Sequence, residues 1–182
     1  MEITGAAAAL QVADLNKQAQ AYVIVRVQDR YCALPVAQVV EVLRVPHLGG
    51  ARVDVPGMLG VMTLRGVPVA VFSFAHLVGI AATHTALVDD EDEKQRRLIS
   101  LRGDRSADAP SVLALMVDEV IGVQTMEPGS LTELLLPGGR EQHIGRFEGR
   151  LAVLLQASGL VPLEALEFAL ADAEQDTTRY GS

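Results

Sequence analysis

The segment of residues 56–66, PGMLGVMTLRG, and the apolar stretch that follows it at residues 67–74 constrain the fold more than any other part of the chain. The three glycines of this segment permit backbone angles that are closed to other residues, so they predict tight corners. Arg65 is its lone charge and nothing in it pairs a nucleophile with a base, so the segment favours binding over catalysis. The turn residues that we expect are Pro56, Gly57 and Gly60.

Short apolar strands follow one another closely in the first half of the chain. Residues 21–27 and 31–36 flank a polar turn at 28–30 and predict a hairpin. Residues 39–45 predict a further strand that ends at Pro46. No helical segment separates these strands, as it would in a βαβ unit, so the pattern is typical of small β-barrels.

Two segments of the second half repeat segments of the first at nearly the same offset. Residues 33–42 align with 114–123, and residues 66–72 align with 149–155. A shared β composition can produce such matches, but we favour an internal duplication because two matches occur in the same order. We therefore predict a mainly β fold of two small five-stranded barrels, SH3-like or OB-like, packed together.

The chain is expected to divide into an arm, a central domain and a helix. Residues 1–20 have weak helical spacing and predict a flexible or weakly helical N-terminal arm. Charged runs near residues 83–97 predict a solvated seam between two interleaved barrel lobes of a domain that spans 21–162. Pro162 and the leucines after it predict a C-terminal helix and tail over residues 163–182.

Composition argues against several function classes. The net charge is -8, only 4% of residues are aromatic and Trp is absent, so we expect no nucleic-acid partner. The longest apolar stretch, residues 67–82, is interrupted by polar residues and falls short of a membrane span, and the N-terminus lacks the basic region of a signal peptide. With Cys32 as the single cysteine, these features predict a soluble cytoplasmic protein without direct membrane insertion.

No motif predicts an enzyme, a metal site or a cofactor. Ser73 and Ser158 are the candidate nucleophiles, and Ser73 lies three residues before His76, but neither serine has a Gly-x-Ser-x-Gly turn or an orienting carboxylate. Cys32 is expected to be a buried packing residue. A small β-barrel that binds a ligand or an oligonucleotide stays open as another class. The histidines, which lack the spacing of a zinc site, are His47, His76, His84 and His143.

A family signature becomes visible when four segments are read together. They are Val39-Val-Glu-Val42, Val55-Pro-Gly-Met-Leu-Gly-Val-Met-Thr-Leu-Arg-Gly66, Val117-Asp-Glu-Val120 and Gly149-Arg-Leu-Ala-Val-Leu-Leu155. In their order and spacing the chain resembles the CheW-like family of chemosensory adaptors over nearly all of residues 20–162. The resemblance implies a two-barrel adaptor, without catalytic activity, that joins the cytoplasmic tip of a methyl-accepting chemoreceptor to the CheW-like domain of a CheA-type histidine kinase. It would reach membrane receptor arrays through these partners.

The resemblance also implies a contact site around Arg65. It makes Arg65 the arginine that supports receptor contact, with Val39 and Glu41 on the neighbouring strand. Lone arginines in apolar hairpins are often interface anchors, whereas the alternative is that Arg65 only pairs with a local carboxylate. The residues expected to bind the receptor or the kinase are Arg65, Val39, Glu41, Leu64, Gly66 and Val61.

Four positions depart from the family pattern. Thr63 stands where the family usually has Asn and therefore lacks an amide, and Ser73 stands where the strand commonly ends in Asp. Gln156 and Ala157 replace the acidic end of the corresponding strand in the second half. These changes suit an alternative role as a divergent member of a pilus-motility or other non-swimming pathway, acting as a competitor or array spacer. Self-association within an array also stays open.

Overall fold

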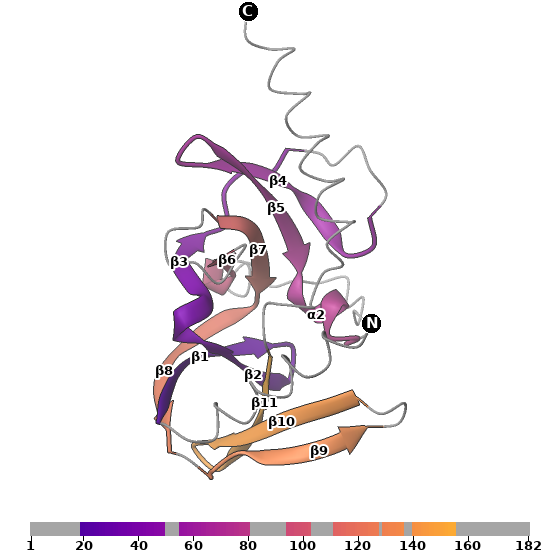
Figure 1. The fold of residues 1–182 in the computed structure, drawn as a ribbon. Helices are drawn as coiled ribbons and strands as arrows, with labels where there is room; N and C mark the ends of the chain where they lie inside the picture. The colour runs from indigo at the N-terminus through magenta and orange to yellow at the C-terminus, as the bar shows by residue number, and fades with distance from the viewer. Residues whose placement is uncertain are drawn as a thin grey trace, which may run out of the picture.

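The computed structural model describes residues 19–49, 55–80, 94–102, 111–127, 129–136 and 140–155. Within these ranges the chain is almost entirely strand (Figure 1). The elements are β1 (Gln20–Val27), β2 (Arg30–Pro35), η1 (Val36–Gln38), β3 (Val39–Arg44), β4 (Met58–Leu64), β5 (Val67–Ser73), α2 (Phe74–Leu77), β6 (Arg97–Arg102), β7 (Ser111–Val117), β8 (Glu119–Met126), β9 (Thr132–Leu136), β10 (Arg140–Phe147) and β11 (Arg150–Leu154).

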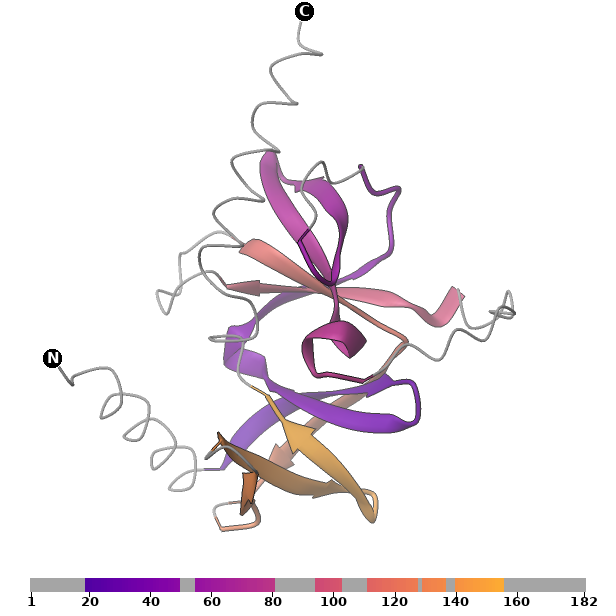
Figure 2. The same ribbon diagram turned by 90° about the vertical axis from the view of Figure 1, so that its right-hand side faces the viewer.

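The strands form two sheets, which lie one above the other in Figures 1 and 2. The lower sheet has six strands in the order β8-β1-β2-β11-β10-β9, and the upper sheet has five in the order β3-β6-β7-β5-β4. We call them barrel 1 and barrel 2, because each curls around an apolar cluster of its own. The chain enters barrel 2 after β2 and returns to barrel 1 after β7, so each barrel contains strands from both halves of the sequence.

The connection near residues 83–97, where we expected a seam, joins two strands of the same barrel. β5 precedes it and β6 follows it, and both strands belong to barrel 2. The crossings between barrels lie instead at η1 and between β7 and β8. A charge run indicates a solvated loop, but it carries no information about which sheet the flanking strands join. Most of this connection lies outside the described residues, as do the expected arm up to residue 18 and the expected C-terminal helix.

The strand pairing of barrel 2 recurs in barrel 1 with the same register. In each barrel an antiparallel hairpin (β4–β5 or β10–β11) joins a strand of the other sequence half (β7 or β2) through a parallel ladder. This repetition agrees with the duplication predicted from the sequence. Equivalent pairs are Leu64↔Val67 and Phe147↔Arg150 in the hairpins, and Val71↔Ala114 and Leu154↔Ala33 in the parallel ladders.

The sixth strand of barrel 1 has a reduced counterpart in barrel 2. β9 pairs with β10 through a ladder that includes Thr132↔Ile144, and the single bridge Gly49↔Val61 occupies the equivalent place beside β4. Five strands per barrel were expected, and barrel 1 has one more because this segment forms a full strand there. Gly60 makes the bridge in barrel 2 feasible, because a Cβ at this position would overlap the carbonyl oxygen of Gly49.

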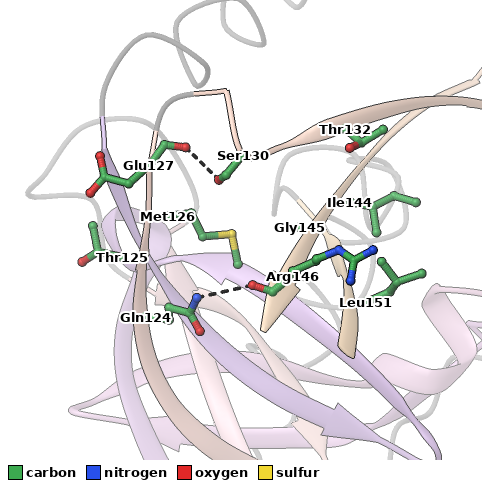
Figure 3. Close-up of a pocket in the computed structure, with 10 residues that line it drawn as sticks. All are labelled: Gln124, Thr125, Met126, Glu127, Ser130, Thr132, Ile144, Gly145, Arg146 and Leu151. Carbon is green, nitrogen blue, oxygen red and sulfur yellow. Dashed lines mark hydrogen bonds between the residues drawn. The ribbon is translucent and has the colours of Figure 1, made fainter. Parts of the chain in front are cut away.

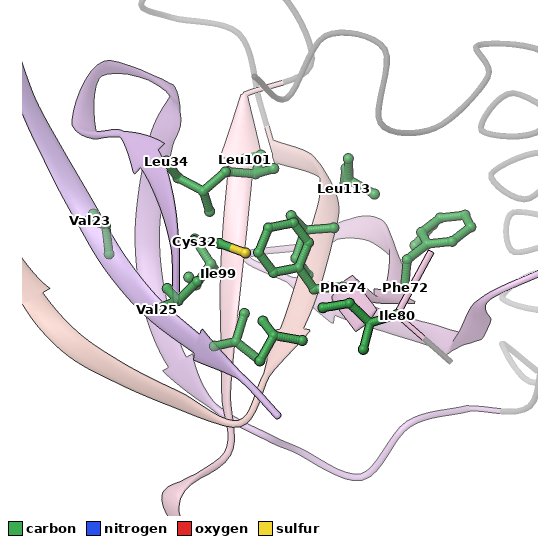
Figure 4. Packing of buried hydrophobic residues seen from close by; sticks show 14 residues of the cluster. Val23, Val25, Cys32, Leu34, Phe72, Phe74, Ile80, Ile99, Leu101 and Leu113 are labelled. Carbon is green, nitrogen blue, oxygen red and sulfur yellow. The ribbon is translucent and has the colours of Figure 1, made fainter. Parts of the chain in front are cut away.

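Three apolar clusters stabilise the fold, one inside each barrel and a larger one between them. In β1, Tyr22 and Ile24 enter the cluster inside barrel 1, whereas Val23 and Val25 enter the layer between the barrels (Figure 4). Because side chains alternate along a strand, burial of both faces requires a continuous apolar run. This explains why residues 21–25 of β1 form an uninterrupted apolar run. Phe74 of α2 fills the same inter-barrel layer.

Gly60→Ala should destabilise the protein by roughly 3 kcal/mol, because overpacking against Gly49 adds to the strain of a positive φ. Gly66→Ala is the matched control: Gly66 also has a positive φ, of 83°, but a Cβ there meets no atom within 4 Å. The control should cost roughly 1 kcal/mol. Urea unfolding of the two variants measures the difference, and equal losses would contradict a close approach at Gly60.

Candidate functional site

Arg65 lies at the tip of the β4–β5 hairpin. Arg65 and Gly66 have φ values of 53° and 83°, and Leu64 pairs with Val67 on either side of them. Two central residues with positive φ define the type I′ turn that matches the twist of a two-residue hairpin. This turn holds the Arg65 backbone in a left-handed conformation and directs its side chain outward, where 77% of it is exposed.

The structure brings Arg65 and Glu41 together. Nη2 of Arg65 donates to Oε2 of Glu41 at 3.1 Å, and the Glu41 side chain is 22% exposed. Glu41 belongs to β3 and Arg65 follows β4, so the ion pair joins the two outer strands of the five-stranded sheet and helps to close barrel 2. The other oxygen of Glu41, Oε1, is buried and has no hydrogen-bond partner. A register shift beside Glu41 in β3 is bridged by Ser100, whose hydroxyl donates to the Glu41 carbonyl at 3.3 Å.

The other expected contact residues occupy different environments. Leu64 is half-buried against the cluster inside barrel 2, and Gly66 is exposed beside Arg65. Val61 is tied to Gly49 by two backbone hydrogen bonds of 3.0 and 3.2 Å. Val39 packs against the layer between the barrels. The structure therefore gathers Arg65, Glu41, Leu64 and Gly66 at one end of barrel 2 but uses Val61 and Val39 mainly for packing and closure.

Pro56 and Gly57 form a turn that leads into β4. The Met58 amide donates to the Val55 carbonyl at 3.0 Å, and Gly57 has a φ of 80°. Proline followed by a residue with positive φ is the pattern of a type II turn. A Cβ at Gly57 would also collide with the ring of His76, so glycine is required for both reasons.

Barrel 1 carries an exposed apolar edge that sequence reasoning missed. β9 is the last strand of its sheet, and its side chains Leu134 and Leu135 are 43% and 71% exposed. Leu151 of β11, in the same sheet, is 61% exposed. The available signal was a run of three leucines, residues 134–136, between two Pro-Gly turns. Such a run, bounded by turn residues, predicts a strand.

The described residues hold no nucleophile paired with a base. The Ser73 hydroxyl accepts from the backbone N–H of His76 at 3.3 Å, and Ser73 is thus the N-cap of α2. The same residues contain no cluster of three His, Cys, Asp or Glu side chains that would hold a metal. Ser158 and His84 lie outside the described residues, as do Gln156 and Ala157.

The aromatic rings of barrel 1 are engaged within the protein. The guanidinium of Arg150 lies 5.2 Å from the ring centroid of Tyr31 and donates to its hydroxyl at 2.6 Å. Tyr31 also contacts Phe147, with 6.0 Å between ring centroids. These contacts leave little aromatic surface for base stacking, which disfavours the oligonucleotide-binding alternative. Among the helices that are described, none has the length and apolar character to cross a membrane.

Comparisons with known proteins decide the family. The family model described as the CheW-like domain matches residues 21–165. The chain belongs to the CheW-like family. This family comprises adaptor and scaffold proteins of chemotaxis signalling. No curated protein matches the CheW-like chain.

A solved structure shows the same fold as this CheW-like protein. The scaffolding protein TtCheW from Thermoanaerobacter tengcongensis superimposes with a TM-score of 0.62 at 15% sequence identity. The superposition covers 83% of this chain and 93% of that chain. The mainly β, two-sheet architecture is therefore that of the CheW-like fold, as the sequence predicted.

Cys32 of this CheW-like protein is a packing residue, because it is 2% exposed within the layer between the barrels. Burial raises the pKa of its thiol from 9.0 to about 11, and nearby Arg30 offsets this only in part. A thiol with such a pKa is protonated at neutral pH and is a poor nucleophile.

The free energy of unfolding should fall as the pH rises from 9 to 11, by up to about 2–3 kcal/mol from Cys32 alone. The sign follows because the unfolded thiol ionises above its pKa of 9.0 whereas the folded thiol stays protonated to about 11. Below pH 9 this contribution is fully present. Urea unfolding of the protein and of Cys32→Ala across this range isolates the effect, and parallel pH profiles would contradict it.

Proposed function

We propose that this CheW-like protein is a non-catalytic adaptor that couples a methyl-accepting chemoreceptor to a CheA-type histidine kinase on the cytoplasmic side of a receptor array. One observation supports the proposal: two exposed surfaces of different chemistry lie on two different barrels. A charged surface at the end of barrel 2 contains Arg65 and Glu41, and an apolar edge of barrel 1 contains Leu134 and Leu135. An adaptor must hold two partners at once, and separate surfaces permit this.

The charged surface suits the receptor tip. An ion pair as exposed as Arg65–Glu41 contributes at most about 1 kcal/mol to stability, so stability alone does not account for it. The Arg65 guanidinium uses one of its five N–H donors in the bond to Glu41, and the other donors can reach acceptors on a partner. The type I′ turn fixes the Arg65 backbone and the bond to Glu41 restrains its side chain before binding, which lowers the entropy cost of recognition.

The apolar edge of β9 suits the kinase. A strand at the edge of a sheet presents unpaired backbone groups, and exposed leucines on it favour association with another sheet. Leu134 and Leu135 point to opposite faces of the strand because side chains alternate, so a partner that adds beside β9 covers both. The CheW-like domain of the kinase, itself a two-barrel fold as the family resemblance implies, offers strand edges of this kind.

Arg65→Glu should weaken binding of a receptor cytoplasmic tip at least about tenfold, or 1.4 kcal/mol, while stability changes by less than about 1 kcal/mol. Isothermal titration with a receptor fragment measures the affinity. The matched control is Arg30→Glu, which changes an exposed arginine at the start of β2 in barrel 1 and should leave receptor binding normal.

The exchanged pair Arg65→Glu with Glu41→Arg separates recognition from closure of barrel 2. If Arg65 contacts the receptor, the exchanged pair restores the ion pair but not the binding. If receptor affinity returns in the exchanged variant, the ion pair only closes the barrel and the proposed contact is wrong.

Leu135→Asp should weaken binding of the kinase CheW-like domain by about tenfold or more, because the complex would bury the new carboxylate without a partner of opposite charge. Receptor binding should not change, because the proposed receptor surface lies on barrel 2. Val123→Asp is the matched control, since Val123 is 67% exposed in the same sheet but lies on β8, at the opposite edge. Surface plasmon resonance against both partners measures the two affinities. Normal kinase binding by Leu135→Asp would exclude β9 as the kinase surface.

A further inference from the structure

Two arginines flank an exposed leucine on barrel 1. Arg146 of β10 pairs with Leu151 of β11 in the antiparallel ladder. In the parallel ladder between β11 and β2, Ala152 pairs with Tyr31. Leu151, one residue before Ala152, therefore lies beside Arg30 of β2. The three residues form one row across β2, β11 and β10, which we call the Arg–Leu–Arg row.

The row faces away from the interior of barrel 1. The next residue along each strand, Tyr31, Ala152 or Phe147, packs in the apolar cluster inside the barrel. Because neighbouring side chains on a strand point to opposite faces, the side chains of the row point outward. Leu151 is 61% exposed, and both arginines are exposed as well. In Figure 2 the tip of the β10–β11 hairpin points away from barrel 2, which leaves this face open to a partner.

The groove beside the row is a surface and not an empty space. Figure 3 shows Arg146 and Leu151 at one side of this groove, with Met126 beneath it. A Cβ at Gly145 would lie 2.7 Å from Sδ of Met126 and 3.3 Å from Cδ2 of Leu131, so these two side chains already fill the floor. A partner segment can therefore lie across the row but cannot insert into the barrel.

The row is positively charged although the chain is acidic, with a net charge of -8. Within the ranges that the structure describes, neither the Arg30 nor the Arg146 guanidinium bonds a carboxylate. Asp29 and Glu148, the acidic residues nearest along the chain, lie in the adjoining turns. Arginine is enriched at protein interfaces because its planar guanidinium matches the geometry of a carboxylate. The row thus complements a partner that carries an apolar side chain between two carboxylates.

The spacing of the row favours a helical partner. Neighbouring strands are roughly 4.8 Å apart, so Arg30 and Arg146, which are two strands apart, are separated by roughly 10 Å. In an α-helix, residues i and i+7 share a face at a separation of roughly 10.5 Å, with i+3 and i+4 between them. In an extended segment, residues on one face are separated by roughly 6.6 or 13 Å, and neither separation matches the row.

We propose that the Arg–Leu–Arg row binds an acidic amphipathic helix of a partner protein. Carboxylates at positions i and i+7 of that helix bond Arg30 and Arg146, and an apolar side chain at i+3 or i+4 packs on Leu151. The row lies apart from Arg65 on barrel 2 and from Leu135 on β9. The helix is therefore a third partner, and failure of this proposal leaves the proposed receptor and kinase surfaces untouched.

Titration of the isotope-labelled full-length protein with a synthetic helix, followed by NMR, tests the proposal. The probe is a stapled alanine-based peptide with two glutamates seven residues apart and a leucine four residues after the first glutamate. Stapling removes the cost of helix nucleation from the measured affinity. The amide signals of Arg30, Arg146 and Leu151 should shift most. A peptide with its glutamates four residues apart spans only roughly 6 Å and should bind about threefold more weakly.

Reversal of charge on the protein separates recognition of the probe from non-specific attachment. Arg146→Glu should weaken binding of the acidic probe about threefold, and Arg30→Glu/Arg146→Glu should weaken it about tenfold. The double variant should instead bind the same peptide with lysines in place of both glutamates, because the ion pairs are re-formed with opposite polarity. Arg44→Glu, which changes an exposed arginine of β3 in barrel 2, is the matched control and should bind the acidic probe normally.

Equal affinity of the unmodified protein for the glutamate and lysine peptides overturns the proposal, and so does normal binding of the acidic probe by the double variant. Signal shifts centred on Arg65 or on β9 overturn the assigned surface. The absence of any shift at millimolar probe concentration overturns it as well. The same spectra report whether each variant is folded, and the two single variants replace the double variant if it is not.

Discussion

The apolar layer between the two barrels is the constraint on which the rest of the structure depends. β1, β5 and β7 have one face in this layer and the other inside a barrel. Separating the barrels would expose Phe72, Phe74 and Leu115, which are fully buried. Among the described strands, the chain also crosses between the barrels twice. Barrel 1 and barrel 2 therefore form one body, and the proposed contact surfaces on them are held at a fixed distance and orientation.

The two barrels have matching strand registers but different side chains at equivalent positions. The ion pair of barrel 2 has no counterpart, because the positions equivalent to Arg65 and Glu41 are Glu148 and Gly122. Both hairpin tips keep the same backbone, since Glu148 and Gly149 also have positive φ values of 46° and 78°. A few side chains on one repeated scaffold thus distinguish a charged end from an apolar edge.

Local signals were sufficient to predict most strands and the hairpin around Arg65. Glycines, prolines and β-branched residues determine the conformation of the backbone at their own positions. β1 to β5 could therefore be predicted from the sequence alone. The contact of Arg65 with Glu41 depends on closure of barrel 2, so the sequence offered pairing of Arg65 with a local carboxylate only as an alternative and did not name Glu41 as that partner. The exposed apolar edge at β9 was missed because exposure of Leu134 and Leu135 depends on which strand ends the sheet. The barrel that each strand joins could not be predicted, because strand exchange between barrels has no local signature in the sequence.

Simultaneous binding tests the central claim most directly. The stoichiometry and mass of a mixture of this protein, a receptor cytoplasmic tip and the CheW-like domain of the kinase can be measured by sedimentation velocity. Two separate surfaces on one rigid body predict a ternary complex in which each partner binds without displacing the other. If the kinase domain displaces the receptor fragment at saturating concentration, the partners share one surface, and the account of a two-surface adaptor is contradicted.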